Sequence, residues 1–124
     1  MKYLKEIKAG ETSVVPKTID GKTVYGVRGY CYQSQVTNSS SNRIKIAISS
    51  SIKVLEQYAF YFGGYYTYVD LYVGYAENEG RPAGWNSSWI YQTNSSSSYR
   101  KYYYIDNNSE INDEVKEKYW TDNF

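Results

Sequence analysis

Residues Gln57 to Ala76 decide the fold, and they read QYAFYFGGYYTYVDLYVGYA. Both halves of this segment are rich in aromatic and β-branched residues, and Gly63-Gly64 lies between the halves. Because glycines accept the positive φ angles of a tight turn, the pattern predicts a β-hairpin with its turn at these two glycines. We expect the other strands to pair with this hairpin or to cover it.

The second half of the segment alternates between two faces, since successive side chains of a strand point to opposite sides of a sheet. One face predicts a core face, and its residues are Val69, Leu71, Val73 and Tyr75. The opposite face carries aromatic rings and one acid, and its residues are Tyr66, Tyr68, Asp70 and Tyr72. This second face is a candidate binding surface.

Length and charge limit the classes of function. A chain of 124 residues suits one domain, residues 1–124. The net charge is +1, which provides no broad electrostatic field for nucleic acid or for an anionic membrane. The sequence has neither an apolar run that could span a bilayer nor the apolar core of a signal peptide after Met1, so we expect a soluble protein without membrane insertion.

Cysteine and histidine are nearly absent from the chain. Cys31 is the only cysteine and there is no histidine, so neither an intrachain disulfide nor a thiolate zinc cluster can form. The commonest general base and metal ligand is missing as well. We expect no cofactor and no metal, and we interpret Cys31 as a small buried side chain.

Tyrosine is the most informative part of the composition. The chain has 17 tyrosines but only 3 phenylalanines, while Leu, Ile and Val are scarce. Tyrosine must fill part of the core, and each buried hydroxyl then needs a partner. The excess of hydroxyl groups indicates that many rings lie at boundaries such as an interface or a ligand face. A thin aliphatic core also favours stabilisation by oligomerisation.

Two further segments predict strands. Residues 18–25 read TIDGKTVY, in which Asp20-Gly21 is a strong signal for a two-residue hairpin turn of type I′. Residues 43–50 read RIKIAISS and predict a half-buried strand with Ile44, Ile46 and Ile48 on its inner face. Residues 1–17 form an arm or a strand, and residues 110–124 form a helix or a last strand, with the helix preferred.

The elements together predict an all-β class. Short strands recur with polar turns between them, which favours an antiparallel β-sandwich with a jelly-roll-like arrangement. No internal repeat is evident in the sequence.

Trp85, Trp89 and Tyr91 share one face of another expected strand, because they are two or four residues apart. Together with Tyr66, Tyr68 and Tyr72 they could form a platform on which a sugar ring stacks, and Asp70 would bond the sugar hydroxyls. The alternative is that the tryptophans occupy the inner face of a strand. Spacing alone does not separate these interpretations.

Three other groups have a possible chemistry and a simpler explanation. Glu77 and Glu79 could serve a glycoside hydrolase, although acidic turns are more often solvated loops. Residues 106–110 offer oxygen ligands for calcium but lack the spacing of an EF-hand loop, so a plain turn is preferred. Basic residues beside aromatics could bind single-stranded nucleic acid, but the charge balance argues against it; these are Arg43, Lys45, Arg100 and Lys101.

The segment TIDGKTVY resembles the hairpin W-I-D-G-K-P-I/V-Y that opens a small β domain in many phage tail-fibre and baseplate proteins. The matching residues are Ile19, Asp20, Gly21, Lys22, Val24 and Tyr25. Thr18 replaces the usual tryptophan of this motif and Thr23 replaces the usual proline.

The resemblance implies a non-enzymatic component of a bacteriophage virion, in a tail fibre, a baseplate or the capsid. Such a component binds the host surface or neighbouring virion proteins, usually as a homotrimer. We therefore expect a homo-oligomer that contacts other virion proteins or a host-surface glycan through its aromatic face. A bacterial carbohydrate-binding or adhesin-like module is the alternative.

Overall fold

The computed structural model describes residues 5–6, 10, 12–15, 18–34, 37–49, 51–64 and 66–104. Every regular element among these residues is a β-strand, so the prediction of an all-β class is confirmed for this part of the chain. The strands are β1 Lys5–Glu6, β2 Thr12–Val14, β3 Thr18–Ile19, β4 Lys22–Thr23, β5 Gly26–Val27, β6 Tyr32–Ser34, β7 Ile44–Ile48, β8 Val54–Leu55, β9 Phe60–Phe62, β10 Val69–Val73, β11 Ile90–Gln92 and β12 Arg100–Tyr104.

Two four-stranded sheets contain most of these strands. Sheet A has the order β1-β6-β9-β11, and sheet B has the order β2-β7-β10-β12. All neighbouring strands within both sheets are parallel. A third, two-stranded sheet pairs β5 with β8, also in parallel, and an isolated bridge from Leu55 to Trp85 continues it.

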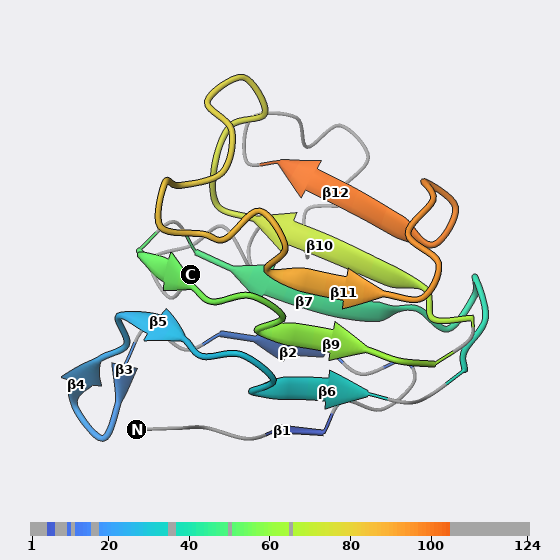
Figure 1. Ribbon diagram of the computed structural model, residues 1–124, viewed down its shortest axis with the longest axis horizontal. Coiled ribbons are helices and arrows are strands. Elements are labelled where there is room, and N and C mark those ends of the chain that lie inside the picture. The colour runs from blue at the N-terminus through green and yellow to red at the C-terminus, as the bar shows by residue number, and fades with distance from the viewer. Residues whose placement is uncertain are drawn as a thin grey trace.

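The chain visits the sheets in a repeating order and thereby builds stacked coils (Figure 1). Coil 1 contains β1 and β2, coil 2 spans residues 26–48, coil 3 spans residues 54–73, and coil 4 spans residues 85–104. In Figure 1 the arrows of β6, β9 and β11 run opposite to those of β7, β10 and β12, as expected when one coil contributes a strand to each sheet. The described residues thus form a β-solenoid, in which each coil contacts its neighbours.

Parallel pairing corrects two expectations. The antiparallel sandwich is not confirmed, because only β3 and β4 pair in the antiparallel direction among the described strands. The hairpin expected at Gly63-Gly64 is wrong as well, since β9 belongs to sheet A and β10 belongs to sheet B. The Gly63 amide instead donates a hydrogen bond of 2.9 Å to the Ser34 carbonyl of the preceding coil. The glycines therefore lie where the chain leaves one sheet for the other.

The hairpin predicted at Asp20-Gly21 is confirmed. Thr18 pairs with Thr23 and Ile19 with Lys22, which leaves two residues in the loop. Asp20 has φ 51° and Gly21 has φ 76°, and positive φ at both central residues is the requirement of a type I′ turn. This hairpin interrupts the path from coil 1 to coil 2.

The core lies between the sheets and is aliphatic at its centre. The inner faces predicted for residues 43–50 and 69–75 are confirmed: Ile44, Ile46, Ile48, Val69, Leu71 and Val73 are fully buried, and Tyr75 is 9% exposed. Because Ile46 pairs with Leu71 and Leu71 with Tyr102, equivalent side chains of successive coils stack in a ladder. Phe60 and Phe62 of sheet A belong to the same hydrophobic cluster.

The sequence allows alternative structures at both ends of the chain. In the N-terminal segment, residues 1–17, the described strands are β1 and β2. The helix or strand expected over residues 110–124 lies outside the described residues.

Leu71→Ala tests the ladder at the centre of the core. We expect a loss of about 2–5 kcal/mol in the free energy of unfolding, since a fully buried leucine is replaced and a cavity is left behind. Lys101→Ala, at an exposed position of β12, should change the same quantity by less than about 0.5 kcal/mol. Urea denaturation measures both, and equal losses would contradict the assignment of the core.

Gly26→Ala tests the close approach of coils 2 and 3. A Cβ atom on Gly26 would lie 2.5 Å from the Val54 carbonyl oxygen, a backbone atom of the paired strand. The coils would have to separate, and we expect a loss of about 1–3 kcal/mol in urea denaturation. Gly21→Asn is the control, because Gly21 has open space around it and asparagine tolerates positive φ. A larger loss at Gly21 than at Gly26 would contradict this description.

Candidate functional site

Four tyrosines gather on the outer face of sheet A, and we call them the tyrosine cluster: Tyr30, Tyr58, Tyr61 and Tyr91. Tyr61 of β9 pairs in register with Tyr91 of β11. Both rings point outward, because the residues on either side of each one are buried. The parallel register therefore places the rings of two coils side by side.

Tyr30 and Tyr58 reach the cluster from the turns before β6 and β9. Their φ values are 61° and 56°, which is the left-handed region that bulky residues rarely adopt. Hydrogen bonds between coils support this conformation: the Tyr30 amide donates to the Tyr58 carbonyl at 2.7 Å, and the Tyr58 amide donates to the Ser88 carbonyl at 2.8 Å. Two successive coils thus use the same strained turn to present a tyrosine.

The rings of the cluster pack on one another. Tyr61 and Tyr91 are stacked, with centroids 4.7 Å apart and planes at 10°. Tyr58 meets Tyr91 edge-on at 5.5 Å, and Tyr30 lies 5.2 Å from Tyr61 at an angle of 43°. These distances are typical of favourable aromatic pairs. Each ring of the cluster is therefore held in place by contacts with other rings of the cluster.

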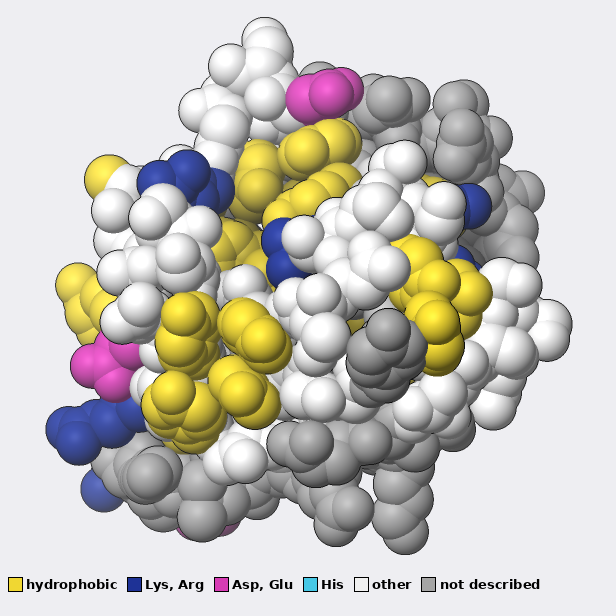
Figure 2. Space-filling model, turned by 45° about the vertical axis from the view of Figure 1, so that its right-hand side comes forward, with side chains coloured by type: hydrophobic (Ala, Val, Ile, Leu, Met, Phe, Trp, Pro, Cys, Tyr) yellow, Lys and Arg dark blue, Asp and Glu magenta, His cyan; other side chains and the backbone are white. Residues whose placement is uncertain are grey.

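The cluster is accessible to a partner. Tyr30 is 45% exposed and the other three rings are half-buried. Figure 2 shows hydrophobic side chains that gather in separate groups on one face of the molecule, with polar side chains between them. Gln33, the residue in register with Tyr61 in coil 2, is exposed and its side-chain amide donates to the Tyr30 carbonyl at 2.8 Å. Apolar rings thus lie beside a hydrogen-bonding group.

Three of the predicted site residues lie outside the tyrosine cluster: Tyr66, Tyr68 and Asp70. Tyr66 is 44% exposed, and Tyr68 stacks on Tyr99 with centroids 4.4 Å apart. Asp70 is 5% exposed and its Oδ1 accepts a 2.7 Å hydrogen bond from Nε of Arg43, which also lies 5.4 Å from the Tyr68 ring centroid. Asp70 neutralises a largely buried guanidinium group, so its carboxylate is not presented to a ligand.

Tyr72 lies two residues after Asp70 on the same face of β10. It is 5% exposed and stacks on Tyr103 of β12, with centroids 4.9 Å apart and planes at 15°. The face of β10 that was expected to be one aromatic surface therefore serves two different contacts.

Trp85 and Trp89 lie in the core. They are 1% and 3% exposed, their rings meet edge-on at 5.6 Å, and Nε1 of Trp85 donates to the Ile52 carbonyl at 2.7 Å. Tyr91 does not share their face, which corrects the expected strand: β11 begins at Ile90, and a turn closed by the Trp89 amide and the Asn86 carbonyl precedes it. This turn directs Trp89 inward while Tyr91 points outward.

The remaining candidates have structural surroundings of their own. Glu77 and Glu79 are exposed at a turn closed by hydrogen bonds to the Ala76 carbonyl. Arg43 is paired with Asp70, and Nε of Arg100 donates to Oε1 of Gln92 at 2.6 Å. Two of the four basic residues considered for nucleic acid are therefore used in internal contacts.

Metal ligands and membrane-spanning helices are described for the same part of the chain, residues 5–104 with its gaps. This part contains no group of three or more potential metal ligands of the His, Cys, Asp or Glu type. The residues considered for calcium, 106–110, lie outside the described ranges. No helix in the described part of the chain is long and apolar enough to cross a membrane.

Three members of the tyrosine cluster were missed in the sequence. The strand register aligns residues 29–34 with residues 57–62 and with residues 87–92. This alignment identifies Tyr30, Tyr58 and Tyr61. Each segment begins with a turn that ends in a buried Cys31, Ala59 or Trp89. Because these three buried residues differ so much in size, the sequences of the three segments do not reveal a repeat.

No protein-family model, no curated protein and no solved structure matches the chain. The likeness of the TIDGKTVY hairpin to phage proteins therefore stays a prediction, and the function is inferred from the geometry of the tyrosine cluster.

Tyr75 follows β10 and is buried against the rings of Trp85 and Tyr104. The pH at which its hydroxyl loses a proton therefore tests this burial. Burial, and then the negative charges that Tyr104 and Tyr102 would acquire, raise the pKa of Tyr75 to about 12 from the ordinary 10.0, while Arg81 lowers it. Between pH 10 and pH 12 the unfolded chain loses this proton and the folded protein keeps it, so stability falls as the pH rises through this window.

We expect Tyr75→Phe to make that fall shallower. The measurement is the free energy of unfolding in urea below pH 10 and at pH 12, compared between the two proteins. Burial also raises the pKa of Tyr104, so a residual fall should remain in the variant. Parallel curves for the two proteins would contradict the role of Tyr75.

Proposed function

We propose that the protein is a non-enzymatic recognition module that binds a protein surface through the tyrosine cluster, and that a second copy of the chain is the first candidate partner. The observation that carries this proposal is the packing of Tyr30, Tyr58, Tyr61 and Tyr91 on one another at an accessible face. Rings held by their neighbours offer a large contact area with little side-chain entropy left to lose.

The ring angles favour a protein partner over a sugar. A pyranose stacks best on a flat, open aromatic face, but Tyr61 and Tyr91 cover each other with planes at 10°. Tyr30 and Tyr58 meet at 76°, so the cluster offers edges and hydroxyl groups instead of one common plane. Protein interfaces are enriched in tyrosines, which combine an apolar body with a polar end.

The wider setting that we propose is a bacteriophage virion, where the chain would contact neighbouring subunits or the host surface. Support comes from the residues of the hairpin motif at Ile19 to Tyr25, which resemble the motif of phage tail-fibre and baseplate proteins. A homotrimer is the expected assembly.

A glycan-binding module, of bacterial or phage origin, is the second candidate. The observation in its favour lies outside the cluster, at Tyr66. This ring is 44% exposed and runs nearly parallel to Tyr99, with planes at 22° and centroids 6.0 Å apart.

The test compares the self-association of three proteins of 124 residues by sedimentation velocity at micromolar concentration. The natural sequence should form an oligomer, and the double variant Tyr30→Ser/Tyr91→Ser should be monomeric, since it loses two rings of the cluster. Tyr25→Ser is the matched control, because Tyr25 is 67% exposed and lies outside the cluster. It should associate like the natural sequence.

Two results would overturn the proposal of a homo-oligomeric interface. One is a natural sequence that stays monomeric, and the other is an oligomer that the double variant leaves intact. A glycan array with the natural sequence and with Tyr66→Ala then examines the second candidate. Binding that depends on Tyr66 would favour it over the protein interface.

A further inference from the structure

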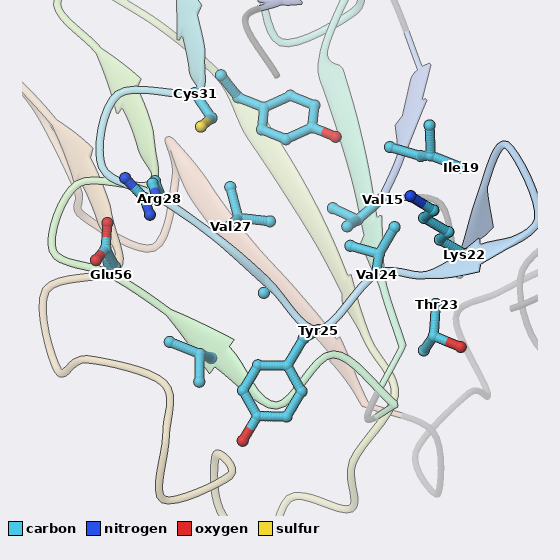
Figure 3. A pocket seen from close by; sticks show the side chains of 13 residues that line it. Val15, Ile19, Lys22, Thr23, Val24, Tyr25, Val27, Arg28, Cys31 and Glu56 are labelled. Atoms are coloured by element: carbon cyan, nitrogen blue, oxygen red, sulfur yellow. The ribbon is translucent and has the colours of Figure 1, made fainter. Parts of the chain in front are cut away.

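A pocket of about 500 Å³ lies beside the β3–β4 hairpin and is lined by none of the four tyrosines of the cluster (Figure 3). Its walls come from the hairpin, from the segment that follows it and from β8. Ligand pockets in proteins commonly have volumes of about 300–1,000 Å³, so this one is large enough for a small molecule.

The floor of the pocket is apolar. Val15, Val27, Cys31 and Tyr32 line it and are each between 3% and 7% exposed. Ile19 and Val24 add apolar surface from the hairpin side (Figure 3). An apolar chain that entered the pocket would therefore remove its surface from water, at a gain of about 25 cal/mol for each Å² buried.

Charge is unevenly distributed around the rim. Arg28 and Glu56 lie on one side of the pocket, where their opposite charges offset each other, and Lys22 lies on the other side (Figure 3). Glu56 also accepts a 3.0 Å hydrogen bond from the Gly29 amide. No described acidic residue forms an ion pair with Lys22, and no acid lines its side of the pocket. One positive charge thus stands beside an apolar floor.

We propose that this pocket binds a small amphipathic carboxylate, which is a molecule with one carboxylate group and an apolar chain. The carboxylate pairs with Lys22 at the rim, and the chain lies over Val27 and Cys31. This inference is independent of the tyrosine cluster and of the oligomeric state.

The alkylation of Cys31 provides an assay for occupancy of the pocket. Cys31 lines the pocket and is the only cysteine of the chain, so its rate of alkylation by iodoacetamide reports whether the pocket is occupied. Dodecanoate, below its micelle concentration, should slow this reaction in a saturable manner. The rate should fall about tenfold at about ten times Kd, since only the open pocket reacts. Dodecanol should protect more weakly, and dodecyltrimethylammonium should not protect.

Variants distinguish the contribution of the Lys22 charge to binding from the contribution of the apolar floor. Lys22→Gln should weaken dodecanoate about three- to fivefold, as expected for a solvent-exposed ion pair, and leave dodecanol unchanged. Lys101→Gln, on β12, is the matched control and should change neither. Ile19→Trp fills the pocket and should abolish protection by both molecules, with an unchanged circular dichroism spectrum as evidence of folding.

Three results would overturn the inference. Dodecanoate could fail to protect Cys31, the cationic analogue could protect as well as dodecanoate, or Lys22→Gln and Lys101→Gln could have equal effects. The first result removes the pocket as a ligand site, and the other two remove the carboxylate as the recognised group.

Discussion

Parallel pairing of each coil with the next is the constraint on which the rest of the structure depends. Register pairs such as Ile46 with Leu71 bring equivalent positions of successive coils into contact, so each inner side chain packs under its counterpart. Burial of these ladders supplies the main stabilising term, because no single coil could remove its apolar face from water. In coil 4 the ladder continues with Tyr102 and Tyr104, which are half-buried and pack against the described core.

The same register explains the two uses of tyrosine. On the inner side, Tyr75 and Tyr104 extend the core where aliphatic residues run out. On the outer side, Tyr61 stacks on Tyr91, and Tyr72 on Tyr103, because the pairs are directly opposite in parallel strands. Stacking along the coil axis holds Tyr61 and Tyr91 in place although they are half-buried, and it also holds Tyr72, which is 5% exposed. The described tyrosines therefore occupy both buried and boundary positions.

Polar side chains connect the loops between coils. Asn38 accepts a 2.7 Å hydrogen bond from the Tyr68 amide and donates to the Tyr68 carbonyl at 3.1 Å, which ties the loop of coil 2 to that of coil 3. Gln92 donates to the Thr67 carbonyl at 3.0 Å and thereby joins coil 4 to coil 3. The Tyr68 carbonyl also accepts a 3.0 Å hydrogen bond from the Ile44 amide, so Asn38 adds a second donor there and provides the acceptor for the Tyr68 amide. Buried backbone groups without partners are costly.

The sequence by itself determined the features that depend on local chemistry. Alternation identified the inner residues of β7 and β10, and Asp20-Gly21 identified its turn, because period and φ preference act over a few residues. Only the tertiary structure decided that the strands are parallel, since a strand alternates in the same way whichever direction its neighbour runs. The spacing of paired residues also varies, from 25 between Ile44 and Val69 to 33 between Thr12 and Lys45, so the repeat was hidden. The tyrosine cluster exists only through this long-range register, which brings together rings that no local pattern connects.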